Sequence, residues 1–73
     1  MGRFLICITD RDRYIVRDMQ KGGFETGVRI HQESEGTRVF KKGAEIAMPK
    51  PRYDFARDED KVFLTDLAAV GAL

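Results

Sequence analysis

The chain has few of the residues from which metal and catalytic sites are usually built. Its 73 residues include one cysteine, Cys7, one histidine, His31, and no tryptophan. A zinc site needs three or four nitrogen or sulfur ligands at defined spacing, and one residue of each kind cannot supply them. A single cysteine also excludes an intramolecular disulfide, on which small secreted domains commonly depend. We therefore expect no metal, no cofactor, no enzymatic activity and a reducing, cytoplasmic environment.

Long apolar runs and a charge excess are missing as well. The longest uninterrupted apolar run is FLICI at residues 4–8. It is far shorter than the roughly 20 residues that span a bilayer, and shorter than the roughly 7–15 of a signal-peptide core. Thirteen basic residues face twelve acidic ones, which leaves a net charge of +1. Proteins that hold nucleic acid without sequence preference usually carry a clear basic excess. We expect no membrane association, and nucleic-acid binding only through a local basic patch.

What the chain does contain suits one small folded domain. Hydrophobic residues make up 42% of the sequence and charged residues 34%. A domain of this length buries only about 60% of the surface that its unfolded chain exposes, so its core must be thin. The expected stability is on the order of a few kcal/mol.

The first third of the chain predicts one strand and then allows two alternatives. Residues 3–9 are rich in β-branched and aromatic side chains and almost continuously hydrophobic, which indicates a central strand or one covered on both faces. Residues 10–13 then form a hairpin loop, with a return strand over residues 14–18. Alternatively, residues 10–21 form a helix that is capped by Thr9 or Asp10 and ends at Gly22. We favour the hairpin, because YIV at residues 14–16 has high β propensity.

The middle of the chain predicts further strands separated by turns. Residues 24–31 alternate between apolar and polar side chains, as a half-buried strand does. Strands over residues 37–41 and 44–48 follow, joined by a turn at Lys42 and Gly43. The expected fold class is mostly β (α+β), with four or five antiparallel strands in a small open sheet or an SH3-like partial barrel.

The last part of the chain changes character after the prolines at positions 49 and 51. An extended linker over residues 49–56 should complete a β domain at residues 1–57, because proline cannot donate to a strand ladder. Residues 58–73 then predict an amphipathic helix and tail. Acidic residues 58–60 suit a helix N-terminus, and an apolar stripe follows at Phe63, Leu67 and Val70, with Gly71 ending the helix. The stripe serves as a lid over the sheet or docks into a groove on a partner.

Basic and aromatic residues cluster around the linker and make the best candidate for a partner-binding site. The candidates are Lys41, Lys42, Lys50, Arg52, Tyr53 and Phe55. Arginine and tyrosine are enriched at protein interfaces, and cations beside aromatic rings also bind nucleic acid. The alternative is a solvated linker whose two rings are tucked onto the sheet.

The remaining reactive side chains predict structural roles. We expect Cys7 to pack in the core and His31 to lie at the surface. The carboxylates near strand and helix ends should be solvated and not paired for acid–base catalysis, which requires burial. These are Asp10, Asp12, Asp18, Glu33, Glu35, Asp58, Glu59 and Asp60.

Two resemblances add expectations to this reading. The stretch RVFKKGAEI at residues 38–46 resembles the turn between two strands of small SH3-like barrels. The chain's length and its arginine- and aspartate-rich character resemble small phage regulators that bind bacterial RNA polymerase, displace the sigma factor and permit antitermination. The resemblance implies a monomeric transcription regulator in the host cytoplasm, acting by protein–protein interaction. The alternatives are an SH3-like nucleic-acid-binding module and a phage inhibitor of a host defence complex.

Overall fold

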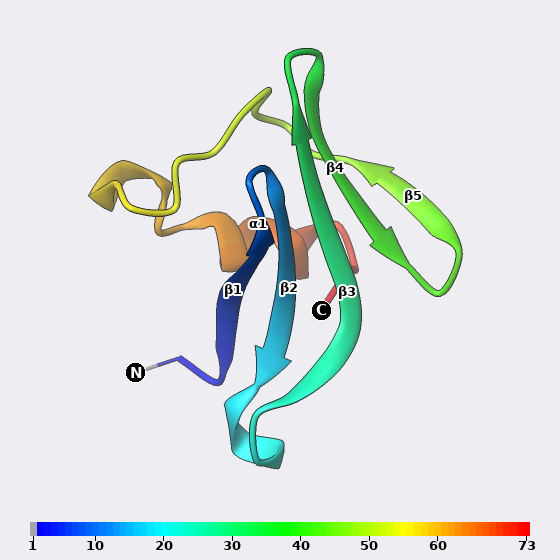
Figure 1. Ribbon diagram of the computed structural model, residues 1–73, viewed down its shortest axis with the longest axis vertical. Helices are drawn as coiled ribbons and strands as arrows, with labels where there is room; N and C mark the ends of the chain where they lie inside the picture. The colour runs from blue at the N-terminus through cyan, green and yellow to red at the C-terminus, as the bar shows by residue number, and fades with distance from the viewer. Residues whose placement is uncertain (1) are drawn as a thin grey trace.

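An open antiparallel sheet and one short helix make up the protein in the computed structural model, which describes residues 2–73. Five strands follow one another across the sheet in chain order (Figure 1): β1 (Phe4–Asp10), β2 (Arg13–Asp18), β3 (Phe24–Glu33), β4 (Gly36–Lys41) and β5 (Ala44–Ala47). Two short 3-10 turns, η1 (Met19–Lys21) and η2 (Asp58–Asp60), and the helix α1 (Phe63–Ala69) complete the fold. The predicted mostly-β class with a C-terminal helix is confirmed. Because β1 and β5 lie at opposite ends of the strand order, the sheet is not closed into a barrel.

The hairpin predicted after the first strand is present, and the helical alternative is wrong. Strands β1 and β2 pair over their whole length, with Ile6 opposite Val16. Asp18 then ends β2 by accepting the backbone N–H groups of Gln20 and Lys21, which starts η1 in place of a long helix. The predicted turn between β4 and β5 is also present. Both of its residues, Lys42 and Gly43, have positive φ angles of 49° and 81°, the combination that a type I′ hairpin turn requires.

Strand β3 alternates as predicted, but a bulge interrupts its pairing with β2. Ile15 lies opposite Arg29, whereas Arg17 lies opposite Glu25, so three residues of β3 face one residue of β2. Gly27, in the middle of this bulge, has a φ of 86°. Because the register shifts by two residues, the same side chains of β3 still point to the same face.

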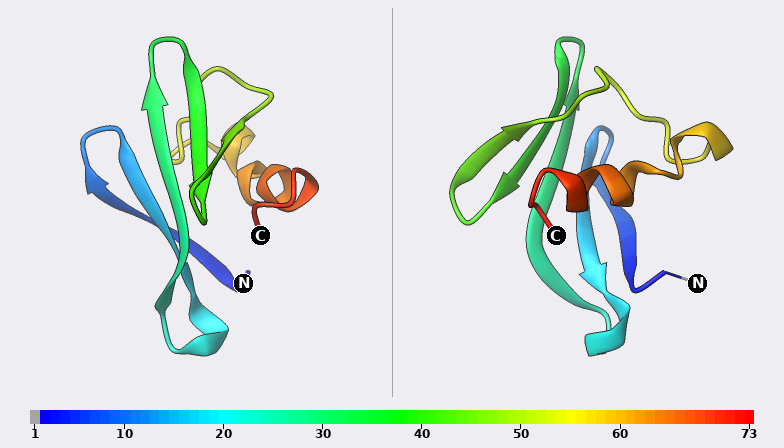
Figure 2. Two further views of the ribbon diagram at one scale, coloured as in Figure 1. Left: turned by 90° about the vertical axis from the view of Figure 1, so that its right-hand side faces the viewer. Right: turned by 180° about the vertical axis from the view of Figure 1, so that it is seen from behind.

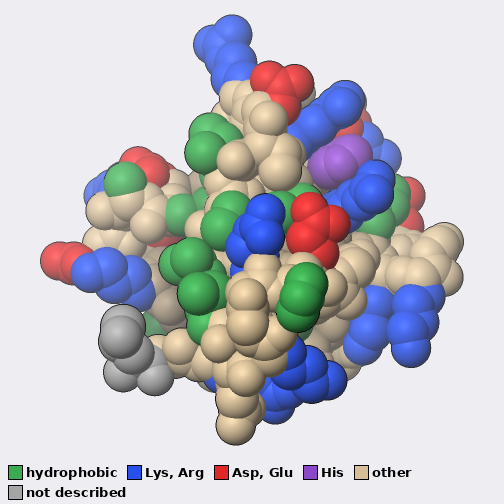
Figure 3. Space-filling model, turned by 60° about the horizontal axis from the view of Figure 1, so that its bottom comes forward, with side chains coloured by type: hydrophobic (Ala, Val, Ile, Leu, Met, Phe, Trp, Pro, Cys, Tyr) green, Lys and Arg blue, Asp and Glu red, His purple; other side chains and the backbone are tan. Residues whose placement is uncertain are grey.

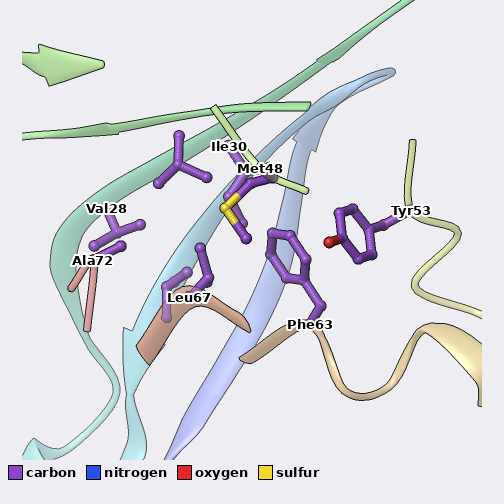
Figure 4. Close-up of a cluster of buried hydrophobic side chains, with 9 residues drawn as sticks. Val28, Ile30, Met48, Tyr53, Phe63, Leu67 and Ala72 are labelled. Carbon is purple, nitrogen blue, oxygen red and sulfur yellow. The ribbon is translucent and has the colours of Figure 1, made fainter. Parts of the chain in front are cut away.

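The linker, η2 and α1 all lie on one face of the sheet (Figure 2), which we call the inner face. The core forms between these two layers, and Figure 4 shows several of its side chains. Its buried members are Val16, Val28, Ile30, Val39, Met48, Tyr53, Phe63, Leu67 and Ala72. Residues before and after position 57 thus contribute to one core, and the helix acts as the predicted lid. One residue of the predicted apolar stripe of the helix differs from the prediction, because Val70 is 36% exposed. Gly71 reverses the chain with a φ of 80°, and Ala72 is buried instead.

Three expectations about individual side chains are corrected by the structure. Strand β1 is an edge strand and not a central one, so Leu5 and Ile8 are 49% and 66% exposed. Cys7 is accordingly half-buried and not part of the core. Two of the carboxylates expected to be solvated, Asp18 and Asp60, are buried, with 5% and 3% of their surface exposed. Each of the two is paired with a cation, Arg3 or Lys50, whose own side chain stays exposed, and the pairing offsets the cost of removing the carboxylate charge from water.

Candidate functional site

The two aromatic rings of the predicted partner-binding cluster belong to the interior. Tyr53 is 4% exposed, and its ring packs edge-on against Phe63 with centroids 4.4 Å apart (Figure 4). The hydroxyl of Tyr53 donates to Asp66 at 3.1 Å. Phe55 is half-buried between Phe63 and Tyr14, with centroid distances of 4.8 and 4.7 Å. The rings are therefore tucked onto the sheet, and Tyr53 has no free face for a partner.

Most of the cations in the same cluster are engaged within the protein. Lys50 forms an ion pair with Asp60 and lies over the Tyr53 ring, 5.4 Å from its centroid. Arg52 pairs with Asp12 at 2.9 Å and ties the linker to the β1–β2 turn. Lys41 donates to the carbonyl oxygen of Gly71 at 3.1 Å. Within residues 2–73, Lys42 alone of the six candidates is exposed and makes no side-chain hydrogen bond or ion pair. The structure therefore does not bring the six residues together into one surface.

The sequence analysis missed the residue that anchors the linker, Gln32. Its side chain is buried, and its amide spans the backbone of Tyr53: Nε2 donates to the carbonyl oxygen at 2.6 Å, and Oε1 accepts from the N–H group. The Thr37 hydroxyl lies 3.0 Å from both the same Oε1 atom and the carbonyl oxygen of Pro51, and its single proton is shared between these two acceptors. The available signal was a polar residue at an inward position of β3, two residues after Ile30. Such a residue needs hydrogen-bond partners that the core side chains do not offer.

The two buried carboxylates hold chain segments in place. The hydrogen bond from Lys50, together with the backbone N–H group of Asp54, lowers the pKa of Asp60. The hydrogen bonds from Arg3 at the start of β1 lower the pKa of Asp18. Burial and the hydrogen bond to Asp66 raise the pKa of Tyr53. All of these shifts come from contacts that hold the linker, the first residues of the chain and the helix in place.

The feature best suited to hold a partner is the free edge of strand β1. Its first six residues, FLICIT, carry no charge and no proline. A groove of about 270 Å³ runs beside this edge and separates it from η2 and α1. The groove is lined by Phe4, Leu5, Ile6, Phe55, Asp60, Lys61, Phe63 and Leu64. An unpaired backbone edge thus lies next to a mainly apolar depression.

The opposite edge of the sheet is built differently. Strand β5 has four residues, AEIA, including the charged Glu45. The chain leaves it at once through Pro49 and Pro51, which have no N–H group to offer. A short, charged edge followed by proline is a common protection against pairing with other chains. Of the two edges, β1 is therefore the less protected one.

Comparison of the chain with protein-family models, with curated proteins and with solved structures finds no match. Within residues 2–73, no helix has the length and apolarity to cross a bilayer.

Proposed function

We propose that this chain is a non-enzymatic binding protein that takes up an extended segment of a partner protein along strand β1. The observation that carries the proposal is the uncharged edge of β1 beside an apolar groove. An edge strand presents a row of unpaired N–H and C=O groups, and a partner strand satisfies them by adding to the sheet. Backbone pairing supplies affinity, and the groove selects side chains.

The geometry of the edge defines the segment that fits. In an added strand, alternate side chains point to the inner face, where the groove lies between β1 and α1. The apolar groove wall at Ile6, Phe63 and Leu64 favours apolar side chains at these alternate positions. The exposed side chain of Ile8 extends the apolar surface along the strand. We therefore expect a short extended partner segment with apolar residues at every second position.

The partner that we propose to test first is bacterial RNA polymerase. The support is the chain's resemblance in size and composition to small phage regulators of that enzyme. In this proposal, binding at β1 inhibits initiation by displacing the sigma factor and permits antitermination, in the cytoplasm of the host. A host defence complex is the second partner of the same chemical kind.

The test combines affinity capture with variants of the edge. The tagged protein is incubated with nuclease-treated bacterial lysate at moderate salt, and retained proteins are identified by mass spectrometry. Leu5→Lys and Ile8→Lys each place a charge on the exposed edge. Phe24→Lys is the matched control, because Phe24 is an apolar side chain that is 75% exposed and lies outside the groove.

We expect the native protein and the Phe24→Lys control to retain RNA polymerase subunits. We expect both edge variants to lose this retention. If a different complex is retained by the native protein and the control and is lost with both edge variants, RNA polymerase is not the partner, but the edge of β1 remains the binding site. Equal retention by all four proteins would reject the edge. Sedimentation of the purified protein tests whether a second copy of the chain occupies the edge. A dimer that both edge variants dissociate would show that β1 binds a second copy, and would overturn the partner proposal.

A further inference from the structure

The face of the sheet opposite the helix is uncovered in residues 2–73 and carries a second, different surface. Figure 1 looks onto this outer face, with α1 passing behind the strands. Strand pairing places Arg29 of β3 opposite Phe40 of β4 and His31 opposite Arg38. These side chains belong to the positions that alternate with the buried core residues of the same strands, so they point away from the core. Figure 3 shows part of this face, where the purple histidine lies among blue lysine and arginine side chains.

Two cations that line one hollow of the outer face have no partner in the described part of the chain. Arg29 and Lys42 are exposed, and neither forms an ion pair or a side-chain hydrogen bond within residues 2–73. Nearby Arg38 differs, because it is held by Glu33 and by Glu45, the latter at 3.3 Å. Arg29 and Lys42 are thus available to an anion from outside, whereas Arg38 is neutralised.

An aromatic pair lines the same hollow as these two cations. Phe40 is half-buried and packs against His31, with ring centroids 4.7 Å apart and ring planes tilted by 56°. A hollow of about 440 Å³ is lined by these four side chains together with Gly27 and Gly43. A Cβ atom added to either glycine would meet nothing within 4 Å. The rim of the hollow is therefore low, and a flat group can approach the rings.

We propose that this hollow binds single-stranded nucleic acid. A base stacks on the Phe40 ring, and the phosphates on either side of it meet Arg29 and Lys42. Base stacking on an aromatic side chain combined with cations along the backbone is the general mode by which sheets bind single strands without sequence preference. An acidic polypeptide would use the two cations but would gain nothing from stacking on the Phe40 ring. A duplex would keep its bases stacked within the helix and out of reach of Phe40.

This surface is separate from the edge of β1, because none of its lining residues lines the groove. The two proposals can therefore fail independently. The expected binding is weak and salt-dependent, since two phosphate contacts give a slope of about −1.4 in log affinity against log salt. Affinity should then fall roughly sevenfold between about 50 and about 200 mM salt.

The experiment is a fluorescence anisotropy titration of a labelled oligo(dT) of about 12 nucleotides, a length within the usual site size of such surfaces. Arg29→Glu and Lys42→Glu each reverse one free cation. Phe40→Leu removes the ring and keeps an apolar side chain, whereas Phe40→Tyr keeps the ring. Arg57→Glu is the control for net charge, because Arg57 is exposed, pairs with Glu59 and lines no part of the hollow, and its reversal changes the net charge by the same amount. Circular dichroism confirms that each variant is folded.

We expect at least tenfold weaker binding for Arg29→Glu, Lys42→Glu and Phe40→Leu, and native binding for Phe40→Tyr, Arg57→Glu and the edge variant Leu5→Lys. Native affinity in Phe40→Leu would overturn base stacking. Equal loss in Arg57→Glu would show that only overall charge matters, which also overturns the site. Competition by poly-glutamate as strong as by unlabelled oligonucleotide would assign the surface to acidic protein, and absence of binding at low salt would reject it altogether.

Discussion

The inner and outer faces of the sheet carry cations of the same kind in opposite situations. On the inner side and at the sheet's ends, Lys50 and Arg3 are paired with the buried carboxylates Asp60 and Asp18. On the outer face, Arg29 and Lys42 have no partner in residues 2–73. A cation paired with a buried carboxylate therefore stabilises the fold, whereas an unpaired cation is free to bind. The partners that the fold places around a charge, and not the density of charges in the sequence, decide between the two.

The aromatic residues divide in the same way. Phe63 and Tyr53 lie on the inner side, where they are 1% and 4% exposed and pack against each other. Phe40 lies on the outer face, where it is half-buried beside His31 and lines the hollow. Inner rings should therefore respond to mutation through stability, and the outer ring should respond through binding.

The largest expected effect is on the inner aromatic cluster. Phe63→Ala removes a fully buried ring and leaves a cavity, which costs about 3–5 kcal/mol. This is comparable with the whole expected stability of a chain of this size, so the variant should be largely unfolded at 25 °C. Circular dichroism and urea titration measure the fraction of the variant that is folded. Phe40→Leu is the counterpart on the outer face and should stay folded. Unfolding of both variants would contradict the prediction that only the inner rings are needed for stability.

The next effect tests the anchor of the linker. Gln32→Ala leaves the N–H and C=O groups of Tyr53 without their partners, at a cost of about 1–3 kcal/mol. Arg29→Ala on the same strand points outward and should change the free energy of unfolding by less than about 0.5 kcal/mol. Urea midpoints of the two variants give the comparison. Equal destabilisation would mean that the linker is not held by Gln32.

Acid titration should show the contribution of the two buried carboxylates. The pKa values of Asp18 and Asp60 are lowered in the folded state from their ordinary value of 3.8. The folded state binds these protons less readily than the unfolded state does. Its stabilisation is therefore fully present above pH 3.8 and is lost as the pH falls from 3.8 towards the folded pKa values.

The measurement is the urea midpoint as a function of pH, for the native protein and for Asp60→Asn. The variant should be less stable at neutral pH and should lose less stability on acidification. A native profile that stays flat below pH 3.8 would show that neither carboxylate is paired in solution.

The smallest expected effect compares two lysines. Lys50→Gln removes the partner of buried Asp60 and should lower the urea midpoint. Lys42→Gln removes an unpaired surface charge and should leave the midpoint unchanged to within about 0.5 kcal/mol. A larger shift of the urea midpoint for Lys42→Gln than for Lys50→Gln would contradict the conclusion that Lys50 stabilises the fold and Lys42 does not.

Much of the local structure could be predicted because it depends on neighbouring residues. The alternation of β3, the turn at Lys42 and Gly43, and the buried positions of Phe63 and Leu67 were all apparent in the sequence. Strand β1 was misjudged for a related reason. A continuous apolar run is typical of a central strand, but here it forms a free edge, and hydrophobicity alone does not say which neighbour is missing.

The candidate sites could not be predicted in the same way. The basic and aromatic cluster at residues 41–55 is contiguous in sequence, but its members are separated or buried in the fold. The outer surface combines Arg29 with Phe40 through strand pairing. The groove combines β1 with residues 60–64. Both surfaces join segments that are distant along the chain.

The sequence by itself determined the class of fold, the turn at Lys42 and Gly43, and the apolar side of β3 and of the helix, because these follow from backbone preferences and short-range periodicity. Only the tertiary structure decided which charges are paired and which are free. Lys50 meets Asp60 across ten residues, Arg3 meets Asp18 across fifteen, and Arg52 meets Asp12 across forty. The physical reason is that an ion pair requires two side chains within about 4 Å of each other, and only strand pairing and the packing of the linker onto the sheet bring them to that distance.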